Sequence, residues 1–273
     1  AAVRLFGWIS VREAAERLEA TLATLDKLKR CRGHFYNWYD THNLQPLEPR
    51  YVSTVDSGNL AGHLLTVAQA CLDWKHDAVD PGFDVEALAL ARREARASGV
   101  GGSQLDADLQ GLEAEFATLR STGVRDVSRL GALLAGVAAA REAVRSLEPA
   151  DDRANEILFW LNAAASGIER QLREALADRL RALALGMDFA FLLDRNRMLL
   201  SIGYREQDGA LDPSCYDLLA SEARLASLLA IAKGDVPSKH WFRLSHALTP
   251  TGFGAVLVSW SGSMFEYLMP ALV

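Results

Sequence analysis

The middle of the chain can form little other than helices. Residues 84–185 are rich in Ala, Leu, Arg and Glu and nearly free of aromatic residues. This texture is interrupted at residues 99–102 (GVGG), at Gly123 and at Pro149, which divides it into about four predicted helices. Arg and Glu at helical spacings are typical of solvent-exposed faces. We interpret residues 84–185 as a helical insertion or scaffold layer that carries no chemistry of its own.

Two further helices are predicted in front of this zone. Leucines recur at intervals of three and four residues from Leu18 to Leu28, so a helix is expected over residues 11–30. The next helix is expected to begin at Asp56 or Ser57, because either side chain can accept a hydrogen bond from the backbone of a first helical turn.

The remaining segments predict a loop, a hairpin and one more helix. Pro46 and Pro49 should prevent regular pairing, so residues 34–53 are expected to form a loop. Residues 187–206 contain two apolar runs joined by Asp-Arg-Asn-Arg, a pattern typical of a hairpin. Residues 214–233 have helical periodicity that ends at a glycine. The fold class is therefore predicted to be predominantly all-α with a small β-hairpin.

The change of texture on either side of the helical zone predicts the domain organisation. Residues 1–83 and 186–273 are expected to form one domain, into which residues 84–185 are inserted. The chain opens in AAVRLFGW and stops in the apolar run MFEYLMPALV, whereas free termini are normally polar. We therefore expect a segment of a longer protein, with part of its site supplied from elsewhere.

Composition argues against several classes of function. The 273 residues carry a net charge of −6, which is opposite to the basic patch that nucleic acid requires. No apolar run approaches the roughly 20 residues that span a bilayer, so this segment is not expected to insert into a membrane. Cys31, Cys71 and Cys215 are too widely spaced for a zinc site or a disulfide framework. No glycine-rich phosphate loop and no metal-binding pair of histidines is apparent, so neither a cofactor nor a metal is expected.

Polar groups gather in one short window, residues 51–63 (YVSTVDSGNLAGH). The window holds Asp56, Asn59 and several hydroxyls, and it follows the aromatic run HFYNWYD at residues 34–40. Asp56 can be explained by helix capping alone. Together, however, the two stretches suggest the lip of a polar cleft that binds a ligand rich in hydroxyl groups.

Two glutamates occupy apolar surroundings. Glu222 falls on the apolar stripe of the helix predicted over residues 214–233, between Leu218 and Leu225. A carboxylate there must either pair with an inward arginine or project into a cleft, where burial raises its pKa and suits it to general-acid work. Glu266 lies among Met264, Phe265 and Tyr267.

Aromatic residues flank all of these carboxylates. Sugar rings stack their apolar faces on aromatic side chains and direct their hydroxyls to carboxylates and amides, so the mixture fits a carbohydrate site. The same aromatic residues also fit an ordinary core or interface. The aromatic residues concerned are Tyr36, Trp38, Tyr39, Tyr216, Trp260 and Tyr267.

Three stretches closely resemble the central region of cyclic β-1,2-glucan synthases, which are large bacterial inner-membrane proteins. The stretches are GHFYNWYDTHNLQPLEPRYVSTVDSGNLAGHL (residues 33–64), DPSCYDLLASEARLASLLAIAKGDVP (residues 212–237) and SWSGSMFEYLMP (residues 259–270). The resembling region is the cyclisation domain, glycoside hydrolase family 189, which is related to the endo-β-1,2-glucanases of family 144. Only residues 84–185 do not align.

The resemblance implies a transglycosylase that joins the ends of a linear β-1,2-glucan into a ring, with anomeric retention. It implies a partial (α/α)6 barrel, with Glu222 as the acid and a second essential glutamate expected beyond residue 273. It also implies a location on the cytoplasmic side of the inner membrane, with the glucan and the other domains of the synthase as partners. The substrate-binding residues would be Tyr36, Trp38, Tyr39, Asp40, Asp56, Asn59, Tyr216, Trp260 and Glu266.

Two alternatives use the same residues. An endo-β-1,2-glucanase would employ the same acid and differ only in how the acceptor is positioned. A non-catalytic glucan-binding module would use the aromatic residues without the acid.

Overall fold

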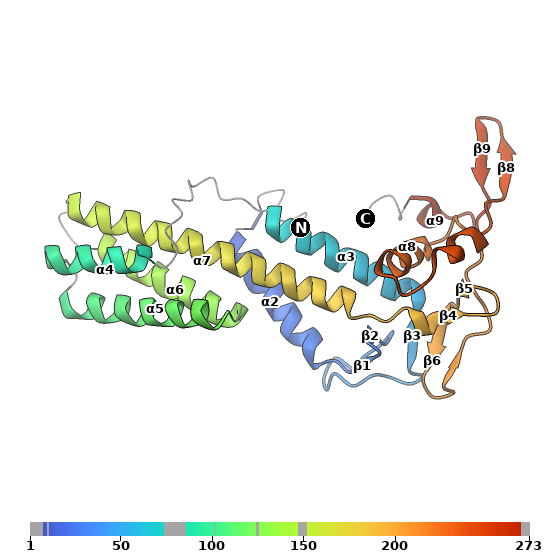
Figure 1. Ribbon diagram of the computed structural model, residues 1–273, viewed down its shortest axis with the longest axis horizontal. Helices are drawn as coiled ribbons and strands as arrows, with labels where there is room; N and C mark the ends of the chain where they lie inside the picture. The colour runs from blue at the N-terminus through green and yellow to red at the C-terminus, as the bar shows by residue number, and fades with distance from the viewer. Residues whose placement is uncertain are drawn as a thin grey trace. The chain divides into compact units, whose positions relative to one another are not determined.

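Helices account for most of the described structure, which confirms the predicted predominantly α-helical class (Figure 1). The computed structural model describes residues 8–9, 11–73, 86–100, 102–123, 126–146 and 152–268. Pro149, one of the predicted helix breaks, lies outside these residues. The helices are α2 (Val11–Lys27), α3 (Thr54–Asp73), α4 (Glu86–Ser98), α5 (Gly102–Thr122), α6 (Val127–Arg145), α7 (Asp152–Leu185), η1 (Ala190–Leu192), α8 (Arg224–Lys233), η2 (Ser238–Arg243) and α9 (Met264–Leu268).

The strands are short and form four small antiparallel sheets. They pair as β1 with β2, β3 with β6 and β7, β4 with β5, and β8 with β9. The strands are β1 (Arg30–Cys31), β2 (His34–Phe35), β3 (Tyr51–Ser53), β4 (Leu193–Asp194), β5 (Leu199–Leu200), β6 (Gly203–Arg205), β7 (Ala210–Leu211), β8 (Leu248–Thr251) and β9 (Gly254–Leu257).

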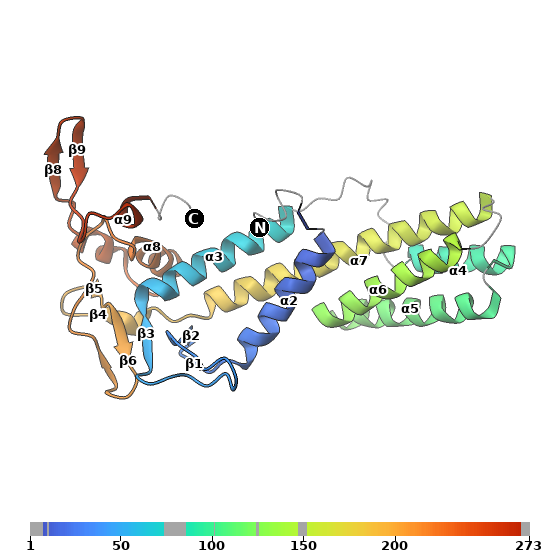
Figure 2. The ribbon, with the colours of Figure 1, turned by 180° about the vertical axis from the view of Figure 1, so that it is seen from behind.

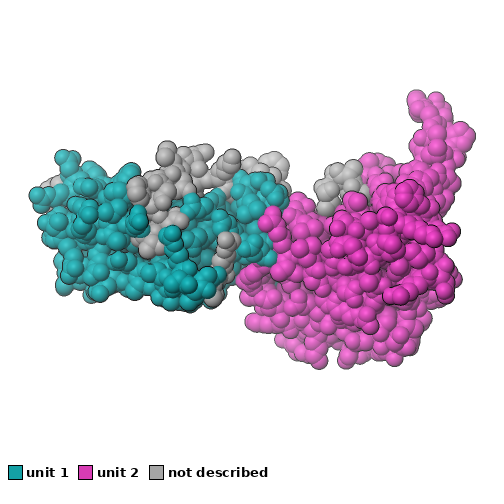
Figure 3. Space-filling model, in the orientation of Figure 1, with its two compact units in different colours: residues 1–21, 69–178 teal, residues 22–68, 179–273 magenta. Residues whose placement is uncertain are grey.

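The chain divides into two compact units (Figure 3). Unit 1 consists of residues 1–21 and 69–178, and unit 2 of residues 22–68 and 179–273. Helices α2, α3 and α7 each contribute residues to both units. The domain boundaries proposed from the sequence, at residues 83 and 185, stay a prediction.

Unit 1 is built from helices whose buried side chains follow the helical repeat. Helix α5 packs against α4 and α6, and it buries Leu105, Leu109 and Phe116 on one face. Helix α6 begins where the Asp126 carboxylate accepts a hydrogen bond from the backbone N–H of Arg129, at 3.1 Å. Helices α4 to α7 confirm the prediction of about four helices in this part of the chain.

Unit 2 contains the predicted hairpin, but also strands where a loop was expected. Strands β4 and β5 pair around the Asp-Arg-Asn-Arg turn, as predicted. The loop prediction for residues 34–53 is wrong, because β2 and β3 lie inside that range. Pro46 even takes part in a bridge with Tyr39, since Leu47 donates its N–H to the Trp38 carbonyl oxygen at 3.0 Å. A proline lacks only its own N–H donor, so its neighbours can still pair.

Helix bounds differ from the prediction mainly in front of α8. The helix predicted over residues 214–233 begins only at Arg224 and ends, as expected, at Gly234, whose φ is +83°. The preceding segment pairs with other strands instead: Tyr216 donates its N–H to Leu200 at 2.9 Å, and Leu219 donates its N–H to Ser245 at 3.1 Å. Pairing with distant segments therefore overrides the local helical pattern there.

Candidate active site

The start of α3 is fixed by a serine and not by the aspartate. The Ser53 hydroxyl accepts a hydrogen bond from the N–H of Asp56 at 3.2 Å, and Thr54 donates its hydroxyl to the Ser201 carbonyl oxygen at 2.6 Å. The prediction that Asp56 or Ser57 caps the helix is wrong, because both lie inside its first turn. The carboxylate of Asp56 is consequently exposed and available for other contacts.

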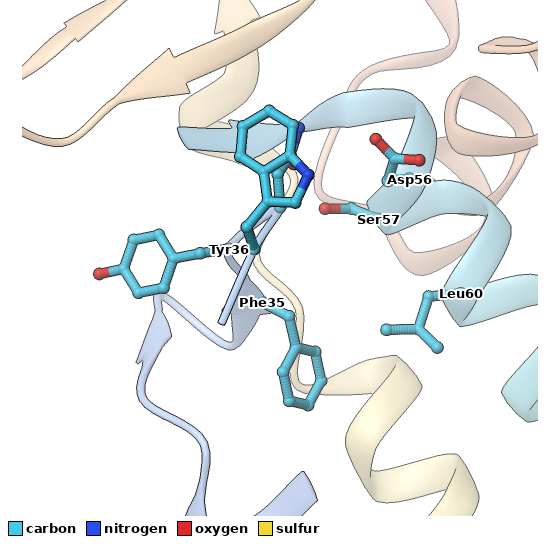
Figure 4. Close-up of a pocket in the computed structure, with 7 residues that line it drawn as sticks. Phe35, Tyr36, Asp56, Ser57 and Leu60 are labelled. Carbon is cyan, nitrogen blue, oxygen red and sulfur yellow. The ribbon is translucent and has the colours of Figure 1, made fainter. Parts of the chain in front are cut away.

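The aromatic run and the polar window do meet at one pocket of about 430 Å³ (Figure 4). Asp56, Ser57 and Leu60 lie along α3, and Phe35 and Tyr36 lie across from them. Of the predicted binding residues, the pocket brings together three. The lining residues are Phe35, Tyr36, Asn37, Trp38, Asp56, Ser57 and Leu60.

The aromatic side of the pocket offers a ring and an amide. Trp38 is 56% exposed and free to receive a ligand. Tyr36 is buried, and its hydroxyl points away from Asp56 to donate a hydrogen bond to Glu206 at 2.6 Å. Burial and this bond raise the pKa of Tyr36. The amide oxygen of Asn37 is buried and has no hydrogen-bond partner in the described part of the chain.

The helix α8 approaches α3 closely because residue 58 is a glycine. A Cβ atom on Gly58 would lie 2.4 Å from the Cβ of Ala226 and 2.6 Å from its Cα. The contact places the start of α8, and the turn that carries Glu222, against the first turns of α3. The polar window therefore shapes the site through Gly58, which lets α8 approach α3, as well as through its polar side chains.

Glu222 sits in the turn before α8 and not on a helical stripe. Burial, followed by the charges of Glu266 and Asp56, raises its pKa above the usual range for a carboxyl group. Among the described residues no ion pair joins Glu222 to an arginine, so the structural alternative finds no support. Two neighbouring negative charges and partial burial favour its protonated form.

Tyr216 belongs to the same electrostatic cluster. Burial, and then the neighbouring Tyr51, Glu222 and Asp56, raises the pKa of Tyr216 to about 12. Its phenol is therefore a hydrogen-bond donor near the two carboxyl groups across the ordinary pH range.

Glu266 is 5% exposed and makes a dense set of hydrogen bonds. Its carboxylate accepts from the N–H groups of Trp260, Ser261 and Ser263 and from both serine hydroxyls, at 2.7–3.2 Å. Burial opposes ionisation, but the bonds from Ser261 and Ser263 outweigh it and lower the pKa of Glu266 to about 2. Ser263 in turn accepts the N–H of Glu266 at 3.3 Å, which completes a capping box for α9.

The remaining predicted residues lie outside the pocket lining. Tyr39 donates its hydroxyl to the Lys29 carbonyl oxygen at 2.6 Å, and Asp40 accepts the N–H of His42 at 2.7 Å, so both shape the loop. Asn59 lies one turn along α3 from Asp56, and its amide oxygen is buried without a partner among the described residues. Trp260 is 57% exposed.

Four lining residues were not predicted as binding residues. Asn37 and Phe35 stand inside the aromatic run, and Ser57 and Leu60 inside the polar window. The signal that could have found Leu60 is its spacing of four residues from Asp56 and three from Ser57 on α3. A spacing of one residue does not place Ser57 on the same helix face as Asp56. All three cysteines are free, and the described residues contain no cluster of three side chains able to hold a metal ion.

Comparison with known proteins points to one relative. No protein-family profile matches the chain. Over 311 aligned positions it is 39% identical to the cyclic beta-(1,2)-glucan synthase NdvB of Rhizobium meliloti (strain 1021). The match covers 99% of the chain, so it includes residues 84–185 and the expectation that these residues do not align is wrong. The chain spans only 11% of that protein. The likeness confirms the resemblance to these synthases, whereas glycoside hydrolase family 189 stays a prediction. None of the helices in the described residues is long and apolar enough to cross a lipid bilayer.

Proposed function

We propose that this chain is the cyclising part of a larger glucan synthase and joins the ends of a linear β-1,2-glucan into a ring with retention. The substrate is proposed from the 39% identity to a cyclic beta-(1,2)-glucan synthase along 99% of the chain. The geometry supports the reaction class, because one carboxyl group with a raised pKa lies near an aromatic and polar pocket.

In this proposal Glu222 is the general acid. It gives its proton to the glycosidic oxygen as the bond from that oxygen to the anomeric carbon breaks. Burial and the negative charges of Glu266 and Asp56 raise the pKa of Glu222 and so favour its protonated form. Retention requires two successive inversions at the anomeric carbon, so a second carboxylate is needed, which we expect from outside these 273 residues.

The pocket residues would hold the sugar. The exposed ring of Trp38 fits an apolar sugar face, and Asp56 and Ser57 fit its hydroxyl groups. The buried amide oxygen of Asn37 needs a donor, which a sugar hydroxyl would supply. Asn59 lies outside the pocket lining and remains a proposed sugar contact.

Other predicted residues have indirect or neighbouring roles in the proposal. We assign Tyr39 and Asp40 to the shape of the binding loop, since hydrogen bonds within the loop already use their polar atoms. The carboxylate of Glu266 is occupied in the same way, and its contribution is a permanent negative charge near Glu222. Tyr216 and Trp260 remain proposed sugar contacts.

Ring closure in place of hydrolysis requires that a hydroxyl of the same glucan chain reaches the site before water does. A pocket that orients the acceptor does this through effective concentration, which contributes about 7–11 kcal/mol in well-oriented cases. We also propose that unit 2 belongs to an (α/α)6 barrel and that the whole protein acts on the cytoplasmic side of a bacterial inner membrane.

Product analysis of the complete synthase tests the proposal. The wild-type protein is expected to convert linear β-1,2-glucan into rings, and Glu222→Gln to lower the rate by roughly 10²–10⁴-fold, the usual contribution of a general acid. Glu142→Gln, at a glutamate side chain that is 77% exposed in unit 1, is the matched control and should leave the rate unchanged.

The outcomes separate the three functions. Linear products that have gained water would indicate an endo-β-1,2-glucanase. Normal ring formation by Glu222→Gln would leave only a glucan-binding role for this chain.

A further inference from the structure

The β8–β9 hairpin presents an apolar surface to solvent. Residues 247–264 contain no Asp, Glu, Lys or Arg, although 23% of the chain is charged. In Figures 1 and 2 the hairpin extends away from α8 and from the other strands of unit 2. Phe253 at its tip is fully exposed, and Leu248 is 62% exposed. The exposed residues that define the hairpin surface are Leu248, Phe253, Val256, Met264 and Leu268.

Such a surface is unfavourable for a two-stranded hairpin that stands alone. Isolated two-stranded hairpins are marginally stable in water, and all residues of β8 and β9 except Leu257 are exposed. Exposed apolar side chains that gather on one element mark interaction sites. Here they lie on both faces of the hairpin, because Leu248 pairs with Leu257 and Val256 pairs with Thr249. The hairpin therefore has the character of an element that is completed by another structure.

The chemistry of the surface favours a protein partner over a sugar. Most of its members are aliphatic, whereas sugars stack on aromatic rings, and only Phe253 provides such a ring. The source of the partner follows from length, because the chain spans only 11% of the synthase it resembles. We propose that the hairpin surface is covered by polypeptide from outside residues 1–273 of the same, longer protein. This proposal rests on the proposed membership of a larger synthase.

The base of the hairpin is bonded to the segment that leads to Glu222. Ser245 donates its N–H to the Asp217 carbonyl oxygen at 2.7 Å, and Ala220 forms a parallel bridge with Ser259. Glu222 follows Ala220 by two residues. A segment that covers the hairpin down to its base would therefore come close to the turn of Glu222 and would limit the access of water there.

Site-specific photo-crosslinking in the complete protein tests the proposal. Phe253 is replaced by p-benzoylphenylalanine, the native protein is irradiated, and crosslinked peptides are identified by mass spectrometry. Mixing isotope-labelled and unlabelled protein separates links within one chain from links between copies. The expected result is a link within one chain to a peptide outside residues 1–273. The same replacement at Arg195, an exposed residue in the β4–β5 turn, is the control and should give none.

Each alternative result overturns the proposal. Links between copies would identify a homo-oligomer interface, links to glucan alone would identify a substrate-binding arm, and no link would show a free surface. Hydroxyl-radical footprinting of the unmodified complete protein checks the result without a variant, and protection of Phe253 and Met264 is expected. Ring formation is assayed on the same sample. If the hairpin surface is unprotected but rings form normally, the surface proposal is wrong and the proposed function stands.

Discussion

Buried polar groups distinguish the two units. Every polar or charged residue that is buried as a whole in the described structure belongs to unit 2. The described buried residues of unit 1 are apolar, and its buried polar atoms belong to partly exposed side chains such as Arg141. The charges of unit 1 pair near its surface, as Arg129 does with Glu115 at 2.6 Å. Burying polar groups requires that each finds a partner. The difference teaches that unit 2 holds individual polar side chains in fixed positions, as a functional site requires, whereas the interior of unit 1 is mainly packed apolar side chains. The buried polar residues are His34, Ser53, Thr54, Ser57, Ser201, Ser221, Ser227, His240 and Glu266.

His240 illustrates what these groups do in unit 2. Its imidazole bonds to the Met198 carbonyl oxygen and to the Ser227 hydroxyl, both at 2.9 Å. Burial lowers the pKa of His240 against the opposing effect of the Met198 carbonyl, so the ring is neutral at physiological pH. The ring thereby ties α8 to the β4–β5 hairpin, and α8 carries the turn of Glu222 at its start.

The largest expected difference concerns two glycines. Gly58→Ala should destabilise the protein by about 2–3 kcal/mol, because the new methyl group collides with the backbone of Ala226. Gly111→Ala on α5 of unit 1 meets nothing within 4 Å and should stabilise it by up to about 1 kcal/mol. Denaturant unfolding monitored for both variants checks the pair. Equal effects of the two substitutions would remove the proposed dependence of unit 2 on this contact.

A smaller effect is expected at Glu266. Glu266→Gln should weaken the turn before α9 by about 1–2 kcal/mol at neutral pH, since charge-assisted hydrogen bonds become neutral. The folded-state pKa of about 2 lies below the ordinary value, so the carboxylate stabilises the fold above that ordinary value. The difference between variant and wild type should shrink as pH falls from about 4 toward 2.

Hydrogen exchange of the α9 amides measures this local stability. Glu115→Gln in unit 1 is the comparison. It should change the exchange of the neighbouring α5 and α6 amides little, because the Glu115–Arg129 pair is about 40% exposed. A pH-independent effect of Glu266→Gln would contradict the assigned role of its charge.

The smallest effect is expected at two exposed aromatic residues. Trp38→Ala should weaken binding of a linear β-1,2-glucan oligosaccharide about 2- to 10-fold, the equivalent of about 0.5–1.5 kcal/mol for one stacked ring. Phe159→Ala removes an equally exposed ring in unit 1, at 54% against 56% exposure, and should leave affinity unchanged. Titration calorimetry measures the glucan affinity of both variants. An equal loss of affinity in Trp38→Ala and Phe159→Ala would show that the glucan does not bind at Trp38.

The same contrast explains what the sequence could predict. The helices of unit 1 follow local periodicity, so their number and breaks were predictable from residues 84–185. In unit 2 the backbone before α8 pairs with Leu200 and Ser245, residues distant in sequence, and its helical pattern was misleading. Long-range pairing leaves no local signature, and neither does the approach of Ala226 to Gly58.

The candidate site was predicted for reasons that were only partly right. The sequence places Glu222 on a helical stripe that the structure does not contain, and the resemblance to the synthases assigns it the role of acid, which stays a prediction. In the structure the charge of Asp56 acts on Glu222. The capping explanation of Asp56 fails because α3 already begins at Thr54, where the Ser53 hydroxyl accepts the N–H of Asp56. Glu266 was recognised as an acid in apolar surroundings, but the sequence could not show that two serines occupy its oxygens.

The central claim is that Glu222 is a general acid whose proton is held partly by the charge of Asp56. The most direct test is the pH dependence of ring formation by the complete protein, measured as kcat/KM for the wild type and for Asp56→Asn. Asp208→Asn, at an exposed surface residue of unit 2, is the control. Removing the Asp56 charge lowers the pKa of Glu222, so the alkaline limb should move to lower pH in Asp56→Asn and stay in place in the control. An alkaline limb unmoved by Asp56→Asn would contradict the account.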